Sequence, residues 1–265
     1  MFNIFHIPVF TAEIRQFPSQ FFYQNLLTDA EQAKSISVIS IPVGNRTSNH
    51  HAPRQILAHE AREEGEVDDN LLELSPVTLL DLRSGGDISV GKSFRNDAEA
   101  HLVGQLLCAL LPHLGSYSVA LITPYKAQVN RLRQVLRDVP ELAALQHARR
   151  AQDAEIEINS VDGFQGREKD VVIFSAVRSN QRYQSSNASG HGGHSIGFVG
   201  DERRLNVAIT RAKRLLIVVG NVGTLGGDAT WAGMIQSLQE RRKVKKLDRP
   251  ESLSQKEILS SLSLN

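Results

Sequence analysis

The sequence predicts an α/β fold in which a parallel β-sheet is covered by helices on both faces. Two observations support this prediction. Runs such as VVIFSAV and LLIVVG are apolar at nearly every position, which is typical of strands that are buried on both sides. Segments with helical periodicity lie between these runs, and strands that alternate with helices imply right-handed crossovers and parallel pairing.

Five segments have the pattern of buried strands. Four of them are continuous apolar runs, and the fifth alternates and is rich in β-branched residues. The four runs span residues 77–82, 119–123, 171–177 and 215–220, and the alternating segment spans residues 156–161.

Three segments predict helices. Asn96 is a candidate N-cap, and Glu99 three residues later predicts a capping box, so a helix is expected from there to about residue 111, before Pro112. A second helix is expected after Pro124 and a third from Asp201. The apolar residues of the second are Val129, Leu132, Val135 and Leu136, and those of the third are Leu205, Val207, Ala208 and Ile209.

The composition fits a protein with an aliphatic core and no membrane partner. Of the 265 residues, 41% are hydrophobic but only 6% are aromatic. The single cysteine, Cys108, lies in an apolar helical run, which favours a buried thiol over a disulfide or a zinc ligand. No stretch is long enough to span a membrane, and residues 1–10 lack the basic region of a signal peptide. We expect an intracellular protein of the nucleus or cytoplasm.

Several polar segments are expected to lie outside the core. The net charge of +1 indicates neither the presence nor the absence of a nucleic-acid partner, so any basic surface must be local. Residues 45–70, 138–153 and 184–195 read as excursions from the fold, and the residues after Val244 read as a polar tail with a short helix from Ser254. The loop histidines lack Cys or carboxylate partners at ligand spacing, so no metal site is predicted. These histidines are His50, His51, His191 and His194.

Residues 160–170, SVDGFQGREKD, carry the densest group of polar side chains. They follow one predicted strand and lead directly into the next, with tight turns at Gly163 and Gly166. Ligands of parallel α/β sheets bind outside the carboxyl ends of strands, so this segment is a candidate phosphate or ribose site. An ordinary polar loop is the alternative interpretation. The polar side chains at the turn are Asp162, Gln165, Arg167 and Glu168.

Two further segments could contact phosphate. Residues 197–214 predict a basic helix, which is most simply a solvated face, but Arg211 directly precedes a predicted strand, where a guanidinium could bind phosphate bidentately. Residues 121–128, LITPYKAQ, place Thr123 at the end of a strand and a helix N-terminus after Pro124, which suits phosphate. Tyr125 offers a face on which a base could stack. Strand–proline–helix junctions are common, so this last signal is weak alone.

Taken together and in this order, the three segments resemble the C-terminal helicase domain of the Upf-like, senataxin-like branch of superfamily 1. The most specific motifs are VDGFQGREKD and RRLNVAITRAK, and the resemblance covers most of residues 93–241. It implies a RecA-like domain at residues 31–243, with polar insertions near 45–70 and 184–195. Residues 1–30 would be the remnant of a preceding helicase segment, and residues 244–265 a polar tail.

The resemblance implies a nucleotide side of this domain. Arg211 matches an arginine finger that reaches the γ-phosphate of ATP bound to a partner domain, where it would neutralise charge during phosphoryl transfer. Glu168 and Gln165 match further positions at the cleft that take part in catalysis. Gly166 would leave room for close approach, and Arg204 would support the same surface. ATP would be bound with Mg²⁺, an ion held mainly by a first RecA-like domain in cis or in trans.

The resemblance also implies a strand side. Thr123, Tyr125, Ser160 and Asp162 match positions that track single-stranded RNA or DNA. Helicases of this class hold the backbone, so binding should depend on salt and only weakly on sequence. One departure concerns a second phosphate-binding arginine, which the family carries in a Gln-Tyr-Arg-Met-His-Pro motif, because Val9 stands in its place.

Residues 86–93 also satisfy the phosphate-loop pattern G-x-x-x-x-G-K-[ST], with Lys92 and Ser93 as the phosphate and ion contacts. Two observations oppose that interpretation: the next helix begins at Asn96 with its own cap, and no later strand ends in an Asp that could hold Mg²⁺. Three functions therefore stay open: a helicase domain that is inactive without its partner domain, a non-catalytic nucleic-acid-binding module, and a self-sufficient phosphate-loop ATPase. Whether the isolated chain is an enzyme is uncertain from the sequence.

Overall fold

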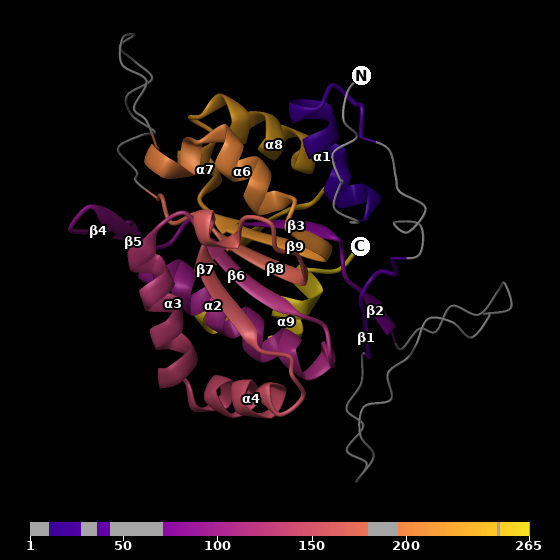
Figure 1. Cartoon of the computed structure of the whole chain (residues 1–265), viewed down its shortest axis with the longest axis vertical. Coiled ribbons are helices and arrows are strands. Elements are labelled where there is room, and N and C mark those ends of the chain that lie inside the picture. The colour runs from indigo at the N-terminus through magenta and orange to yellow at the C-terminus, as the bar shows by residue number, and fades with distance from the viewer. Residues whose placement is uncertain (1–10, 28–35, 43–70, 180–195, 248–249, 265) are drawn as a thin grey trace, which may run out of the picture.

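The structure is a computed structural model, which describes residues 11–27, 36–42, 71–179, 196–247 and 250–264. The predicted insertions near 45–70 and 184–195, the four loop histidines and Val9 lie outside these residues. At the centre is a six-stranded sheet in the order β10-β3-β9-β8-β6-β7, with every neighbouring pair parallel (Figure 1). The strands are β3 (Val77–Leu82), β6 (Val119–Thr123), β7 (Ile156–Ser160), β8 (Lys169–Ser175), β9 (Ala212–Gly220) and β10 (Val244–Leu247).

Helices cover both faces of the sheet, which confirms the predicted fold class (Figure 1). One face carries α1 (Ala12–Phe22), α6 (Glu202–Ile209), α7 (Val222–Leu225) and α8 (Ala229–Glu240). The other carries α2 (Asp97–Leu110), α3 (Lys126–Asp138), α4 (Pro140–Arg150) and α9 (Gln255–Ser261). Strand β3 is buried along its whole length, because its alternate residues face opposite core clusters: Leu79 faces one cluster and Leu80 the other.

Shorter elements connect these layers. A small antiparallel sheet pairs β1 (Ser40–Pro42) with β2 (Leu71–Glu73), and a hairpin pairs β4 (Ile88–Val90) with β5 (Ser93–Arg95). Four 3₁₀ turns are described: η2 (Leu111–His113), η3 (Asp162–Phe164), η5 (Gly197–Gly200) and η6 (Pro250–Ser252).

Predicted strand boundaries are accurate where the strand is apolar throughout. β3 and β6 have the predicted bounds. β8 and β9 begin earlier than predicted, at Lys169 and Ala212, which are register partners across the two strands. Their first residues include Lys169, Lys213 and Arg214, whose polar side chains hide the strand pattern in the sequence.

The start of α2 confirms half of the predicted capping box. Asn96 caps the helix by accepting a hydrogen bond from the Glu99 N–H at 3.1 Å. The reciprocal bond is absent, because the Asn96 N–H donates to Gln128 Oε1 at 2.9 Å instead. Glu99 turns inward, where its Oε2 accepts hydrogen bonds from the Ser175 hydroxyl at 2.6 Å and the Val177 N–H at 2.9 Å. The second half of the capping box was predicted wrongly, because the groups that bind Glu99 come from distant parts of the chain.

The polar segment at 138–153 and the described residues of the predicted tail, 244–247 and 250–264, are parts of the fold. Residues 140–150 form α4, which buries Leu142 against α2 and α3. β10 extends the sheet by pairing with β3, and α9 packs on α2 after a capping box formed by Ser254 and Glu257. The short helix predicted from Ser254 is confirmed as α9. The rest of the tail was predicted wrongly, because only a few apolar residues in this segment reach the core, among them Leu247, Ile258 and Leu262.

Candidate functional site

The motif of residues 160–170 leads from one edge of the sheet to the opposite edge. β7 ends at Ser160 on the carboxyl edge, η3 follows, and β8 begins at Lys169 on the amino edge. Because β7 and β8 both run parallel to β6, the connection between them must cross a face of the sheet. Glu168 therefore lies at the amino end of a strand. The expectation that this turn lies outside a carboxyl end was wrong for Glu168.

Arg211 lies at the same amino edge, directly before β9. Its carbonyl accepts a hydrogen bond from the Lys169 N–H at 2.9 Å, which joins the starts of β8 and β9. Its guanidinium donates to the Val207 carbonyl at 2.9 Å and the Arg167 carbonyl at 3.3 Å. The structure therefore brings Arg211 and Glu168 together at one edge, although they are far apart in the sequence.

The charge of Arg211 is half-buried but not neutralised by a close ion pair. Burial lowers the pKa of Arg211, and the nearby charge of Glu168 opposes this shift. The Glu168 carboxylate lies closest to a different cation, with 3.7 Å between its Oε2 and Lys213 Nζ. Within the described residues, Arg211 forms no ion pair at hydrogen-bond distance, so its guanidinium keeps electrostatic capacity for an anion.

The turn before Glu168 is open to solvent. Gly166 has φ of +78°, a conformation that disfavours L side chains, and nothing described lies within 4 Å of the place where a Cβ would be. Gln165 beside it is exposed. The glycine is thus required by the backbone, and the space next to it is free for a ligand.

The predicted strand-side residues meet at the carboxyl edge. Thr123 and Ser160 are register partners on β6 and β7. Thr123 is buried and its Oγ1 accepts a hydrogen bond from the Tyr125 N–H at 3.5 Å, while Ser160 Oγ accepts one from the Gly163 N–H at 3.3 Å. Both hydroxyls support the backbone that follows their strands.

Asp162 joins the strand side to Arg204, which was expected on the nucleotide side. Arg204 donates from Nε and Nη2 to the two carboxylate oxygens of Asp162, at 2.9 and 3.2 Å. The hydrogen bonds that Arg204 donates to Asp162 raise the pKa of Arg204. This pair connects η3 to α6, so the two predicted surfaces are continuous at this point.

The expectation that Tyr125 presents a stacking face is not met in this structure. The side chain is only 2% exposed, and its hydroxyl donates to the Ile196 carbonyl at 3.1 Å. Its ring packs edge-to-face against Phe94, with 5.5 Å between the ring centroids. Burial raises the pKa of Tyr125, as expected for a phenol inside a core.

An exposed aromatic ring that was not predicted lies nearby on η5. Phe198 is 55% exposed, and its ring centroid lies 6.4 Å from that of Tyr125. The Arg204 guanidinium lies over the Phe198 ring, 4.8 Å from its centroid. The sequence signal that could have identified it is the position of Phe198 between two glycines, directly before the basic helix.

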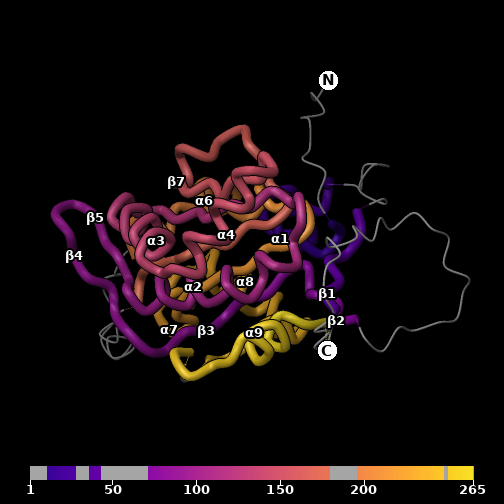
Figure 2. The backbone as a smooth tube through the Cα atoms, turned by 90° about the horizontal axis from the view of Figure 1, so that it is seen from below, coloured from indigo at the N-terminus to yellow at the C-terminus, as the bar shows by residue number. Residues whose placement is uncertain are grey.

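Residues 86–93 form a hairpin and not a phosphate loop. The turn between β4 and β5 contains Gly91, with φ of +59°, and Lys92, at the margin of the molecule (Figure 2). Ser93 Oγ already accepts a hydrogen bond from the Ala127 N–H at 3.1 Å, and α2 begins only at Asp97. A phosphate loop needs the helix to begin at its Gly-Lys, so this geometry contradicts the self-sufficient ATPase.

Two features of the described residues bear on metal binding and on membranes. Within this part of the chain, no three His, Cys, Asp or Glu side chains are grouped so that they could hold a metal ion. None of the described helices combines the length and the apolar character that a membrane span requires.

The sequence is similar to a protein family and to several named helicases. Residues 10–223 match the family described as AAA domain. The chain is 31% identical over 245 residues to "Probable helicase MAGATAMA 3" of Arabidopsis thaliana, an alignment that covers 90% of this chain and 24% of that protein. It is 40% identical over 153 residues to "Regulator of nonsense transcripts 1 homolog" of Drosophila melanogaster, covering 57% of this chain and 12% of that protein.

Two further similarities are more limited. "Helicase sen1" of Schizosaccharomyces pombe is 36% identical over 126 residues, which are 48% of this chain and 6% of that protein. Among solved structures, the C-terminal domain of a possible DNA helicase from Lactobacillus has a TM-score of 0.34 at 14% identity, covering 65% of this chain and 85% of that one. That likeness is too low to support a conclusion.

The matches share one pattern. The chain spans about a quarter or less of the length of each of the three curated relatives. The family match includes Thr123 and Ser160, which end β6 and β7, and Glu168 and Arg211, which directly precede β8 and β9. The chain belongs to the AAA domain family and is a helicase domain of the Upf-like, senataxin-like branch of superfamily 1.

Proposed function

We propose that this chain is the second RecA-like domain of an ATP-dependent RNA or DNA helicase in the nucleus or cytoplasm. In this role it contributes one wall of an ATP site whose other wall belongs to a first RecA-like domain, in cis or in trans. The observation that supports the proposal is Arg211, a half-buried guanidinium at the amino edge of the sheet that has no close carboxylate partner among the described residues.

The nucleotide wall consists of Arg211, Glu168, Gln165 and Gly166. In the proposed complex, Arg211 leaves one of its carbonyl partners and donates to the γ-phosphate, where charge develops during phosphoryl transfer. The open turn at Gly166 lets the nucleotide approach the backbone. Glu168 and Gln165 orient groups at the same edge. Mg²⁺ would be held mainly by the first domain, since the described residues offer no group of three metal-ligating side chains.

The strand wall consists of Ser160 and Asp162 at the carboxyl edge, supported from within by the buried Thr123, with Phe198 in the stacking role expected of Tyr125. Phe198 has the exposed ring that base stacking needs, and the Arg204 guanidinium lies over this ring while it is paired with Asp162. The link between Asp162 and Arg204 couples this wall to α6, the helix that leads to Arg211. ATP at one edge and a single strand at the other would thus act on the same helix.

The test is reconstitution in trans. The chain is mixed with the separately produced first RecA-like domain of a curated relative, and ATP turnover is measured with and without single-stranded oligouridylate. The proposal predicts turnover in the mixture well above the sum of the two separate proteins, and stimulation by the oligomer. A mixture that binds the strand but shows no added turnover would contradict the catalytic role and favour a non-catalytic binding module.

A further inference from the structure

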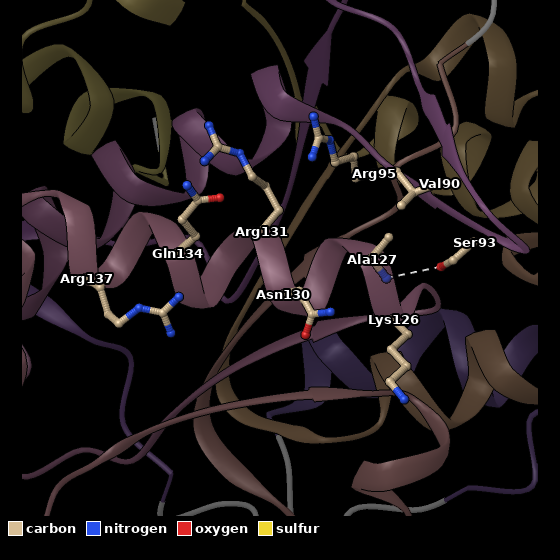
Figure 3. Close-up of a pocket in the computed structure, with 9 residues that line it drawn as sticks. All are labelled: Val90, Ser93, Arg95, Lys126, Ala127, Asn130, Arg131, Gln134 and Arg137. Carbon is tan, nitrogen blue, oxygen red and sulfur yellow. Dashed lines mark hydrogen bonds between the residues drawn. The ribbon is translucent and has the colours of Figure 1, made fainter.

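A basic groove lies between the β4–β5 hairpin and α3 (Figure 3). Its cavity has a volume of about 510 Å³. Four of the side chains that line it are cationic and two are amides, and no described carboxylate lines it. The cations are Arg95, Lys126, Arg131 and Arg137, and the amides are Asn130 and Gln134.

The groove follows most of the length of α3. Lys126, Asn130 and Gln134 are spaced by one helical turn each, and Arg137 comes just before the helix ends. From Lys126 to Arg137 the helix advances about 16 Å. Figure 3 shows Arg95 and Arg131 extending to the same side of the helix, with Lys126 and Arg137 on the other. An extended polyanion could therefore be contacted at several points along its length.

The charges of the groove are only partly balanced. Arg131 Nε lies 2.8 Å and Arg95 Nε 3.5 Å from the same oxygen of Asp97, so two cations share one carboxylate. Within the described residues, Lys126 and Arg137 form no ion pair, and both are exposed. A solvated helix face would also carry unpaired cations, but this face is hollowed and has a second wall supplied by the hairpin.

The two walls are held in place relative to each other. Ser93 Oγ on β5 accepts a hydrogen bond from the Ala127 N–H at 3.1 Å, which joins the hairpin to the first turn of α3. Phe94 packs against Tyr125 below the groove, and the Arg178 guanidinium lies 4.3 Å from the centroid of the Phe94 ring. A groove that is already formed loses little conformational entropy when a ligand binds.

We propose that this groove binds the sugar–phosphate backbone of a nucleic-acid strand, as an accessory site that continues from the strand wall. The inference rests on the proposed function, because it assumes a single strand at the carboxyl edge. Lys126 is adjacent in sequence to Tyr125 and begins the helix that follows β6. A nucleic-acid strand that runs from the carboxyl edge past Thr123 would therefore meet the groove first at Lys126. The cations bind phosphates, and the amides donate to phosphate or sugar oxygens.

The test measures binding of the full chain to fluorescent oligouridylates by anisotropy over a range of salt concentrations. One oligomer has about 5 nucleotides and fits the strand wall alone, and the other has about 16 nucleotides and reaches the groove. The variant is Lys126→Ala with Arg137→Ala. The matched control, Arg150→Ala with Lys256→Ala, removes two exposed cations that do not line the groove. Thermal unfolding checks that each variant is folded.

For the longer oligomer, the groove variant should lower the slope of log K against log salt by about 1.4, since each lost phosphate contact removes about 0.7 on a single strand. The control should keep the wild-type slope, and the shorter oligomer should bind the groove variant as it binds the wild type. An oligothymidylate of the same length separates DNA from RNA as the source of the backbone, and we expect the same loss with both.

Other outcomes separate the two proposals. If the wild type binds both oligomers and the groove variant keeps the wild-type slope, the proposal that the groove binds nucleic acid is overturned. The proposed role of the strand wall is then unaffected. If the control loses as much slope as the variant, general surface charge explains the binding, and the groove is again overturned. If the wild type binds neither oligomer, the proposals that the groove and the strand wall bind nucleic acid are both overturned.

Discussion

Two polar clusters at opposite edges of the same sheet are built in opposite ways. Beneath the carboxyl edge, Glu99 is 1% exposed and accepts hydrogen bonds from Ser175 and Val177, while Gln128 donates to Ser175 at 3.0 Å. At the amino edge, Arg211 is half-buried and donates to the Val207 and Arg167 carbonyls. The first cluster has its hydrogen bonds satisfied from within the chain, and the second keeps a charge available at the surface.

This difference distinguishes polar groups that stabilise the fold from polar groups that could bind a ligand. A buried polar group whose partners are all internal stabilises one arrangement of the chain and has no capacity left for a ligand. Burial raises the pKa of Glu99 to about 8, so the group is mostly protonated at neutral pH and adds little charge. Arg211 remains charged and lies next to the open turn at Gly166. Polar residues at a sheet edge therefore indicate a ligand-binding site only when part of their hydrogen-bonding or ion-pairing capacity is not used within the chain.

The largest expected effect comes from Arg211→Ala. If Arg211 neutralises charge on the transferred phosphoryl group, its loss should lower ATP turnover of the reconstituted pair by about 10³–10⁵-fold. Single-strand binding should change little, because Arg211 lies at the other edge of the sheet. Arg203→Ala is the matched control, as it removes an exposed arginine of α6.

Arg211→Lys separates charge from geometry. Lysine keeps the positive charge but loses the planar fork, so we expect turnover between the wild-type and alanine values. Thermal unfolding of all three variants checks for loss of the bonds to Val207 and Arg167. Turnover by Arg211→Ala close to that of Arg203→Ala would contradict the role of a finger.

Glu99 tests the opposite cluster through stability. Glu99→Ala leaves the Val177 N–H and the Ser175 hydroxyl with one partner fewer in a buried place, which should cost about 1–3 kcal/mol per unsatisfied group. Urea unfolding measures the loss. The folded variant should support as much turnover as the wild type, and an unchanged free energy of unfolding would show that the cluster is not stabilising.

The same residue gives a pH dependence. The pKa of Glu99 rises from 4.5 to about 8 through desolvation, so between these values the folded protein holds a proton that the unfolded chain releases. The contribution to stability is therefore full below pH 4.5 and is lost as pH rises to about 8, by up to about 1.4 kcal/mol per pH unit. Urea unfolding of Glu99→Gln over this range should lack that slope. Parallel curves for wild type and variant would refute the raised pKa.

Phe198 and Tyr125 form a matched aromatic pair. Phe198→Ala should weaken binding of a single-stranded oligomer by about 1–3 kcal/mol, because an exposed ring that stacks on a base is removed. Tyr125→Phe keeps the ring and removes the buried hydroxyl that donates to the Ile196 carbonyl, so it should lower stability by about 0.5–1.5 kcal/mol and leave binding unchanged. Anisotropy and urea unfolding measure the two effects, and unchanged strand binding by Phe198→Ala would contradict the stacking role of Phe198.

The smallest effect is expected for Asp162→Ala. Its bidentate pair with Arg204 is largely exposed, so its contribution to stability should stay below about 1 kcal/mol. Urea unfolding in low and high salt should show a loss that becomes smaller as salt screens the pair. A loss well above that size would mean that the pair anchors α6 to η3.

The sequence predicted elements that depend on local pattern and missed those that depend on distant partners. β3 and β6 were predicted with their bounds because their runs are apolar and end abruptly. β10 was missed because only Leu247 of this short strand is fully buried, so its pattern resembles a tail. Fold class needs only local periodicity, whereas an edge strand depends on a neighbour far away in the chain.

The site was predicted unevenly for the same reason. The motif order predicted that Arg211 and Glu168 belong to one site, and the structure places both at one edge of the sheet, although that edge was predicted wrongly. Tyr125 was interpreted as exposed because the carbonyl that binds its hydroxyl is 71 residues away, on the segment before η5. Phe198 was missed because the exposure of a ring depends on which side chains pack over it, and the sequence does not contain that information.

The most direct test of the central claim, that Arg211 and not residues 86–93 faces the nucleotide, is ATP turnover by this chain alone in the presence of single-stranded oligouridylate. The account predicts no turnover above background, because one wall of the site is supplied by another domain and Lys92 lies in a hairpin turn. ATP turnover by the isolated chain that disappears with Lys92→Ala would contradict this claim. It would mean that the hairpin residues 86–93 bind phosphate.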